Sequence, residues 1–109
     1  MMNDTNKKKS ENFCAVRATL DMIGGKWKLP IISQLQQHEH LRFKDLKQKI
    51  TGITNRMLSK DLKDLEQHAL VTRTIYPEVP PRVEYALTEK GRSLRSLIQE
   101  IKKWGQEHG

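Results

Sequence analysis

Residues Gly52 to Leu70, with the sequence GITNRMLSKDLKDLEQHAL, decide the fold of this chain. Four apolar residues recur at the spacing of a helix that docks on a core: Leu58, Leu62, Leu65 and Ala69. Thr54 stands where the N-cap of that helix belongs. The opposite face carries hydrogen-bond donors and positive charge, namely Asn55, Arg56, Ser59, Lys60, Lys63 and Gln67. Such a helix is either a solvated surface helix or one that enters a DNA major groove, and the rest of the chain must decide between them.

The charge of the chain favours a polyanionic partner. The sequence has 109 residues and a net charge of +7, which is enough chain for one small domain. Residues 42–63 hold seven basic side chains against two acidic ones, so much of the positive excess lies on two consecutive helix-like segments. Localised positive charge favours binding to nucleic acid, because binding releases the counterions condensed there. General solubility does not require the charge to be localised.

The location of the protein is predicted from what the sequence lacks. No apolar run approaches the roughly 18 residues of a membrane span, and no apolar segment follows the N-terminal lysines as a signal peptide requires. A single cysteine, Cys14, excludes an internal disulfide and fits a reducing compartment. We therefore expect a cytoplasmic protein with no membrane partner.

The first half of the chain is expected to be helical after a flexible start. Residues 1–12 are polar and rich in lysine, which predicts a flexible basic arm before a domain that spans residues 13–109. A helix carrying Val16, Leu20 and Ile23 then ends at the glycines 24 and 25. A second helix over 26–36 should bury Trp27, Ile31 and Leu35, with Pro30 tolerated in its first turn, and residues 41–42 are assigned to a short strand.

A helix-turn-helix unit and a hairpin follow. Phe43, Leu46 and Ile50 predict a short helix, and a turn with Gly52 leads into the helix after Thr54. Residues 71–76 and 82–87 then alternate with period two around the proline-rich loop 77–81, which predicts a β-hairpin, that is, a wing. Thr88 can cap a single last helix whose apolar residues are Leu94, Leu97, Ile98, Ile101 and Trp104.

With these elements in this order, the sequence closely resembles the HxlR family of bacterial winged-helix regulators, relatives of the MarR group. The resemblance runs from about Cys14 to His108 and rests on motifs in register: DMIGGKW (21–27), RFKDL (42–46), GITNRMLS (52–59), YPEVPPRVEY (76–85) and LTEKG (87–91). It implies a mainly α fold with a small β-hairpin, a homodimer built through terminal helices, and binding to a pseudo-palindromic DNA operator. Ala15 and Pro30 depart from the family pattern, which commonly has proline after the cysteine and an aliphatic run in the second helix.

The polar face of the helix after Thr54 is the predicted DNA-binding site. Its members are Thr54, Asn55, Arg56, Ser59, Lys60 and Lys63. Arg56 and Asn55 lie in the first turn, where arginine can bind guanine and asparagine adenine through two hydrogen bonds. We expect Lys60 and Lys63 to meet phosphates, together with Lys44 near the start of the third helix and Arg82 at the base of the wing. The predicted dimer interface comprises Val16, Leu20, Leu97, Ile101 and Trp104; core packing alone explains the last three equally well.

Cys14 is a candidate redox or electrophile sensor, as family members with a cysteine at this position imply. We expect it at the start of the first helix, where the helix dipole stabilises a thiolate and Lys7 to Lys9 or Arg17 add positive charge. Its modification would be alkylation, a mixed disulfide with a small thiol, or a Cys14–Cys14 bridge between subunits. The alternative is a small residue packed in the dimer interface.

Other functions find less support in the sequence. His38 and His40 lie two residues apart in a loop, but no cysteine or acidic cluster completes a metal site. No nucleophile–base set or phosphate loop is present, so we expect neither an enzyme nor a cofactor. The remaining alternative to a DNA-binding regulator is a winged-helix module whose basic face binds an acidic protein and which has no thiol switch.

Overall fold

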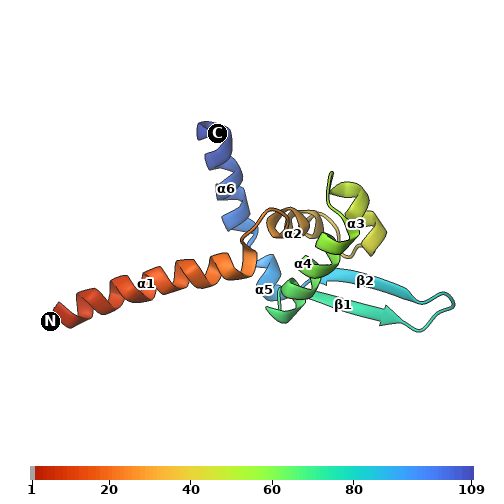
Figure 1. Ribbon diagram of the computed structural model, residues 1–109, viewed down its shortest axis with the longest axis horizontal. Helices are drawn as coiled ribbons and strands as arrows, with labels where there is room; N and C mark the ends of the chain where they lie inside the picture. Colours follow the sequence, from red (N-terminus) through yellow and green to blue (C-terminus); the bar gives the residue numbers. More distant parts are fainter. Residues whose placement is uncertain (1) are drawn as a thin grey trace.

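Helices dominate the computed structural model, which describes the backbone of residues 2–109 and the side chains of residues 12–109 (Figure 1). The elements follow in the order α1 (Met2–Ile23), α2 (Lys28–Gln36), α3 (Phe43–Lys49), α4 (Asn55–Gln67), β1 (Val71–Tyr76), β2 (Arg82–Leu87), α5 (Glu89–Arg92) and α6 (Arg95–His108). The predicted helix-turn-helix is α3 and α4, and the predicted wing is the β1–β2 hairpin. Three parts leave the central body in different directions: α1, α6 and the hairpin.

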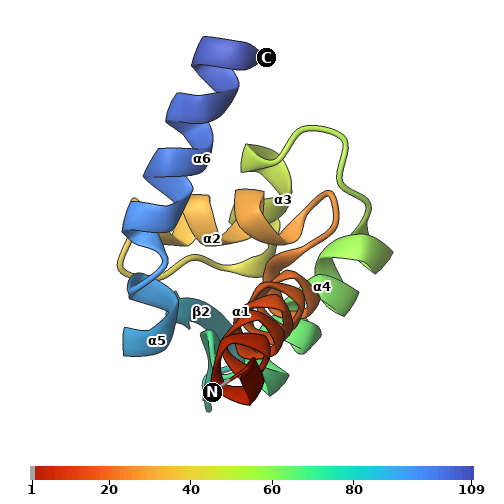
Figure 2. The ribbon, with the colours of Figure 1, turned by 90° about the vertical axis from the view of Figure 1, so that its left-hand side faces the viewer.

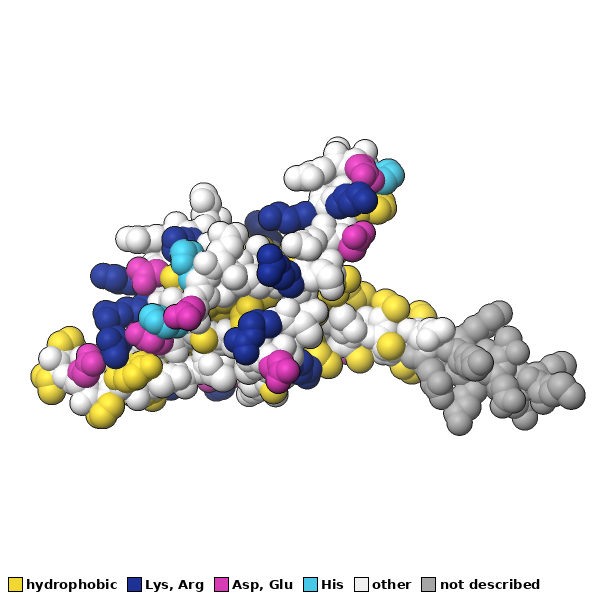
Figure 3. Space-filling model, turned by 180° about the vertical axis from the view of Figure 1, so that it is seen from behind, with side chains coloured by type: hydrophobic (Ala, Val, Ile, Leu, Met, Phe, Trp, Pro, Cys, Tyr) yellow, Lys and Arg dark blue, Asp and Glu magenta, His cyan; other side chains and the backbone are white. Residues whose placement is uncertain are grey.

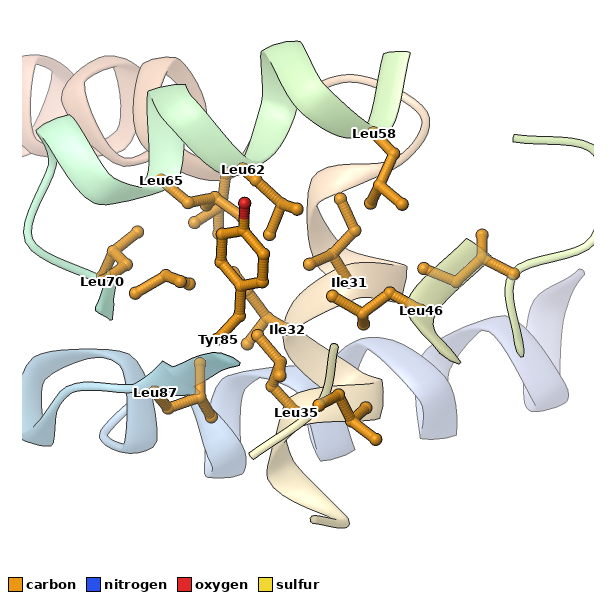
Figure 4. Packing of buried hydrophobic residues seen from close by; sticks show 14 of the residues in the cluster. Ile31, Ile32, Leu35, Leu46, Leu58, Leu62, Leu65, Leu70, Tyr85 and Leu87 are labelled. Carbon is orange, nitrogen blue, oxygen red and sulfur yellow. The ribbon is translucent and has the colours of Figure 1, made fainter. Parts of the chain in front are cut away.

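The core forms where α4 packs on α2. Leu58, Leu62 and Leu65 of α4 are at most 1% exposed, and they point toward Ile31 and Ile32 of α2 (Figure 4). Tyr85 of β2 and Leu46 of α3 close the cluster from two other elements, and Leu35 extends it. Burying several aliphatic side chains at about 1.5–3 kcal/mol each supplies the main driving force for this arrangement. The apolar stripe predicted for residues 58–65 is therefore confirmed.

Most of the residues predicted to be buried in the second helix are buried in α2. Ile31 and Leu35 are buried as predicted, whereas Trp27 is only partly buried and precedes the helix. Pro30 is the third residue of α2, so its missing N–H removes no bond within the helix. The helical spacing did not predict Ile32, which is fully buried because α2 is covered on two sides, by α4 and by α6.

The hairpin pairs β1 and β2 antiparallel, from Val71 opposite Leu87 to Tyr76 opposite Arg82. The strand expected at residues 41–42 is reduced to a single bridge, in which Leu41 and Tyr85 exchange backbone hydrogen bonds of 2.9 and 2.8 Å. This bridge fixes the α2–α3 loop to the base of the hairpin. The outer part of the hairpin has little cover, since Ile75 is 54% exposed.

Helix α4 ends earlier than its apolar stripe suggests. Ala69 is exposed and has a φ of +57°, so its predicted place on the buried stripe is wrong. The backbone N–H of Leu70 donates to the Leu65 carbonyl and that of Ala69 to the Glu66 carbonyl, both at 2.9 Å. This pair of bonds is the helix stop that usually has glycine in the left-handed position. The turn lets Leu70 re-enter the core, where it is 2% exposed.

The single last helix expected after Thr88 is instead divided into α5 and α6. Thr88 caps α5, because its hydroxyl accepts a hydrogen bond from the Gly91 N–H at 3.0 Å. The N–H of Leu94 donates to the Gly91 carbonyl at 3.2 Å, a tighter turn that ends α5 before α6 begins. Gly91 also lies against the carbonyl oxygen of Leu70, where a Cβ atom would collide with backbone.

The two terminal helices extend away from the core. In Figure 2, α1 is seen nearly end-on and α6 rises beside α2. Helix α1 is continuous from Met2 to Ile23, so the expected boundary at residue 12 does not appear in the secondary structure. Met1 and the side chains of residues 2–11 lie outside the described part, and the flexibility of the basic arm stays a prediction. Among the described helices, none is long and apolar enough to cross a membrane.

Candidate nucleic-acid interface

The N-terminus of α4 presents the predicted DNA-binding residues to solvent. Thr54 precedes the helix in an extended conformation, and its hydroxyl accepts a hydrogen bond from the Met57 N–H at 3.1 Å. This cap fixes the first turn, which carries Asn55 and Arg56. Thr54 thus has a defined structural role, and its hydroxyl proton remains available to an acceptor outside the chain.

All the predicted contacts on α4 are exposed on one face. Asn55, Arg56, Ser59, Lys60 and Lys63 are exposed, while the leucines between them are buried. The ion pairs found among the described side chains involve neither Arg56 nor the two lysines. Their charges are therefore free to act on an external anion.

One further exposed residue in the first turn of α4 was not predicted. Met57 is 45% exposed on the first turn of α4. It was not among the residues that the sequence pattern predicted as DNA contacts. An apolar side chain at this point suits the methyl group of thymine, which lies at the edge of the major groove.

Helix α3 adds further cations next to α4. Lys44 is exposed as the second residue of α3, as the sequence predicts, and Lys47 and Lys49 are also exposed. Asp45 lies in the first turn of α3 and is half-buried. The exposed side of the helix-turn-helix is thus dominated by positive charge.

The hairpin borders α4 across an open groove. Ser59, Lys63 and Gln67 of α4 line one side of the groove, and Arg73 of β1 lines the other. Arg73 is exposed and was not among the predicted contacts. The sequence pattern predicted only that Arg73 lies on a strand. The signal that could have identified it as a DNA contact is its positive charge, which the structure places on the side of the hairpin that faces α4.

Arg82 lies elsewhere than expected. It begins β2 beside the tip loop of the hairpin, so its predicted place at the base of the wing is wrong. Its guanidinium is 3.3 Å from a Glu78 oxygen and 3.4 Å from a Glu84 oxygen, and it stacks over the Tyr76 ring at 4.2 Å. Arg82 therefore holds the end of the hairpin together, and a phosphate contact by it stays a prediction.

An ion pair joins α4 to α2 in addition to the leucine contacts. The Lys28 ammonium of α2 is 3.5 Å from an Asp64 carboxylate oxygen of α4. Burial raises the pKa of the neighbouring Asp61 carboxyl, an effect that Asp64 reinforces and that Lys28 and Lys60 partly oppose. Asp61 and Asp64 are thus half-buried on the side of α4 next to Lys28 of α2, whereas the predicted DNA-binding residues of α4 are exposed.

Both terminal helices expose apolar stripes. On α1, Val16 is 60% and Leu20 58% exposed; on α6, Leu97, Ile101 and Trp104 are 39%, 46% and 64% exposed. The core of one protomer therefore does not cover these predicted interface residues. Phe13, at 61% exposed, belongs to the same stripe on α1 and was not among the predicted interface residues.

The environment of Cys14 differs from the expected one. Its thiol is free and exposed, but it lies in the middle of α1, because this helix begins at Met2. The argument from the helix dipole is therefore wrong for this residue. Lys7 to Lys9 lie outside the described side chains, and the guanidinium of Arg17 stacks over the Phe13 ring at 4.9 Å.

The loop histidines do not converge. His38 is exposed, and Nδ1 of His40 is 3.3 Å from a Glu84 carboxylate oxygen. Within residues 12–109, no group of three or more histidine, cysteine or acidic side chains is placed to hold a metal ion.

A short helix, a glycine turn, an exposed polar helix and a flanking hairpin define a winged helix-turn-helix domain. The chain belongs to the HxlR-like helix-turn-helix family, which it matches over residues 22–109, as the sequence motifs predict. It is thus a member of a family of DNA-binding transcriptional regulators.

Known proteins support this assignment. An uncharacterized HTH-type transcriptional regulator from Methanothermobacter thermautotrophicus is 43% identical over 99 residues, covering 91% of this chain and 75% of that protein. The putative regulatory protein MalR of Fusobacterium mortiferum is 42% identical, covering 94% of this chain and 96% of MalR. The structure of the redox regulator HypR in its oxidized form is similar, with a TM-score of 0.81, 41% identity, and coverage of 88% of this chain and 98% of HypR.

Proposed function

We propose that the protein is a sequence-specific transcriptional regulator that acts in the cytoplasm and binds a pseudo-palindromic operator as a homodimer. The observation that carries this proposal is the first turn of α4, where Asn55, Arg56 and Met57 are all exposed next to the cations of α3. Asparagine, arginine and an apolar side chain can together read donors, acceptors and methyl groups in the major groove.

The residues of the interface divide into two roles. Asn55 and Arg56 contact base edges, because the N-terminal residues of a recognition helix reach deepest into the groove. Lys60 and Lys63 lie further along α4 and contact phosphates, with Lys44 on α3 as a third. Arg73 contacts the backbone from the hairpin side of the groove.

The proposed dimer rests on the exposed stripes of α1 and α6. Val16, Leu20, Leu97, Ile101 and Trp104 expose large apolar areas on helices that project from the body (Figure 1). Soluble proteins rarely leave such stripes uncovered, and a second copy of the same chain offers a matching surface. A two-fold axis between these helices would then place two α4 helices in successive major grooves, about 34 Å apart.

Binding of DNA is tested by paired substitutions on α4. Arg56→Ala should weaken binding to a selected operator by about 1–3 kcal/mol per subunit and binding to random DNA far less. Lys63→Ala should weaken both similarly and reduce the slope of affinity against salt by about 1 per subunit. Fluorescence anisotropy with operator and scrambled duplexes measures both. Equal losses on the two duplexes for Arg56→Ala would reassign this residue to a phosphate contact.

We further propose that modification of Cys14 controls DNA binding. Support comes from the exposure of its thiol on a proposed dimer helix and from the similarity to HypR, which is named a redox regulator. An electrophile would form a thioether as the thiol adds to it; an oxidant would take two electrons and two protons from two Cys14 thiols as they join in a disulfide between subunits.

This switch has a simple test. Wild-type protein treated with diamide or a quinone should change its operator affinity, with a matching mass change at Cys14. Where the product is the disulfide-linked dimer, a reductant should cleave the disulfide and restore the original affinity. Cys14→Ser protein should bind the operator normally and not respond. If the serine variant still lost DNA on treatment, Cys14 would not be the sensor.

A further inference from the structure

The groove between α4 and the hairpin has a tyrosine at its base. Its volume is about 570 Å³, and its lining includes Ser59, Leu62, Lys63, Glu66, Arg73 and Tyr85. In Figure 4 the ring of Tyr85 crosses the core from β2, and its hydroxyl oxygen points toward α4 near Leu62 and Leu65. The DNA contacts proposed for α4 and for Arg73 leave this hydroxyl without a role.

Tyr85 is held from both sides, which gives its hydroxyl a fixed position. Its backbone exchanges hydrogen bonds of 2.9 and 2.8 Å with Leu41, and Arg73 is its direct partner across the hairpin. Directly opposed residues of an antiparallel pair project from the same face of the sheet. The side chains of Arg73 and Tyr85 therefore both lie on the face toward α4, as their shared place in the groove lining requires.

The Tyr85 hydroxyl is available to a ligand in the groove. It takes part in none of the side-chain hydrogen bonds found within residues 12–109. The inaccessible polar side-chain atoms without a partner in this part of the chain belong to Trp27, Gln36 and Arg82, so the Tyr85 oxygen is within reach of solvent. Tyrosine hydroxyls at the edge of a core usually have a hydrogen-bond partner. An acceptor in the groove would supply one.

The charge of the groove suits a ligand with a single negative charge. Lys63 and Arg73 are exposed and belong to none of the ion pairs found among the described side chains. One acid, the half-buried Glu66, lines the groove with them, so the two cations leave an excess of one positive charge. A phosphodiester carries one negative charge, whereas a phosphate monoester carries about −1.5 to −2 at neutral pH and would be repelled more strongly by Glu66.

The base of the hairpin, rather than its tip, supplies the cation for such a ligand. Ile75 and Val79 are exposed on the outer part of the hairpin, and Figure 3 shows apolar side chains gathered at the tip, at the left end of the molecule. Arg82 is paired with two glutamates there. Of the two arginines in residues 71–87, Arg73 alone belongs to no ion pair among the described side chains.

We propose that this groove binds one phosphodiester of the DNA backbone, with the phosphate oxygens between Lys63 and Arg73 and the Tyr85 hydroxyl donating from the base. Lys63 belongs to the proposed recognition helix, whereas Tyr85 is fixed to the sheet. A phosphate held by both sets the depth and the register at which α4 enters the major groove. Tyr85 is then a positioning residue that contacts no base. This inference rests on the proposed binding of DNA by α4.

Tyr85→Phe tests this phosphate site in the full chain. The substitution keeps the ring in the core and removes only the hydroxyl, and urea titration checks that stability is unchanged. Affinity for the selected operator should fall at least about tenfold, and affinity for a scrambled duplex by the same factor, because every sequence carries the phosphate. Tyr76→Phe, on the opposite face of the same hairpin, is the matched control and should change neither. Unchanged affinity in Tyr85→Phe protein of wild-type stability, or a loss on the operator alone, would overturn the site.

Replacing single phosphates of the operator by neutral methylphosphonates locates the contact. In wild-type protein one position in each half-site should cost at least about tenfold, and in Tyr85→Phe protein the same position should cost clearly less. The remaining positions should cost the same in both proteins. Additive losses at every position would show that Tyr85 acts only through the fold and would overturn the contact. Competition by inorganic phosphate beyond that of chloride at equal ionic strength, in wild-type but not Tyr85→Phe protein, would overturn the DNA backbone as the occupant in favour of a free anion.

Failure of the phosphate site and failure of the proposed function give different results. Selective operator binding that Tyr85→Phe leaves intact would keep the function and remove the site. Equal binding to all duplexes, weakened about tenfold on each of them by Tyr85→Phe, would contradict sequence-specific recognition and keep the site.

Discussion

Replacing Ile101 by alanine should weaken the proposed dimer by an amount that follows from its exposure. Ile101 is 46% exposed in the protomer, so close to half of its side chain is available for burial by a partner. Full burial of an isoleucine is worth about 1.5–3 kcal/mol, which gives about 1 kcal/mol for this half. A two-fold dimer contains the residue twice, so the loss is about 2 kcal/mol, and the dissociation constant of the dimer should rise about 30-fold.

Sedimentation equilibrium over a range of protein concentrations measures this constant. Gln106→Ala, at an exposed position on a different side of α6, should leave the constant unchanged and serves as the matched control. Operator affinity should fall in the Ile101→Ala protein at concentrations below the new dissociation constant and recover above it. The proposed interface is refuted if Ile101→Ala and Gln106→Ala dimerise equally well, or if wild-type protein stays monomeric at tens of micromolar.

Three further substitutions, and Ala86→Gly as a control, test the fold and its response to pH. Ala69→Gly should raise the melting temperature by about 3–6 °C, because glycine adopts the positive φ of this helix stop without strain, whereas Ala86→Gly in β2 should lower it. Gly91→Ala should lower the free energy of unfolding by about 1–3 kcal/mol in urea titrations, since the new Cβ would collide with the Leu70 carbonyl; unchanged stability would contradict the close approach of these two segments. Burial raises the pKa of the Asp61 carboxyl, so folding favours its protonated form and its charge destabilises the fold at neutral pH. Asp61→Asn should therefore raise the melting temperature at pH 7, with a gain that shrinks as the pH falls through the range in which wild-type Asp61 takes up its proton; a gain independent of pH would contradict the assignment.

The parts of the fold that were predictable from the sequence are those set by local periodicity. Leu58, Leu62 and Leu65 lie three to four residues apart, and this spacing alone places them on one buried face, as the structure confirms. The same rule failed at Ala69, because the helix stop there depends on Leu70 returning to a core formed by other elements. It also missed Ile32, whose burial requires both α4 and α6 to cover α2.

The candidate site was predictable to the extent that it lies on one helix. The exposed face of α4 follows from its own sequence, but the contribution of Arg73 depends on where the hairpin lies beside that helix. Arg82 shows the opposite case, in which a residue predicted as a contact is paired within the chain. Its charge suggested a DNA contact, yet Glu78 and Glu84 surround its guanidinium once the hairpin forms. Composition gives the number of charges, whereas only the packing of the strands shows which of them are paired.

The most direct test of the central claim is selection of DNA from a random duplex library, followed by anisotropy titrations of the selected and scrambled duplexes from about 50 to 200 mM salt. Recognition by two α4 helices of a dimer predicts enrichment of one pseudo-palindrome with half-sites about one helical turn apart. It also predicts at least about a thousandfold preference over the scrambled duplex, and an affinity that falls by orders of magnitude across the salt range. Enrichment of no sequence, with equal affinities for both duplexes, would contradict recognition by α4 and favour an acidic protein as the partner of its basic face.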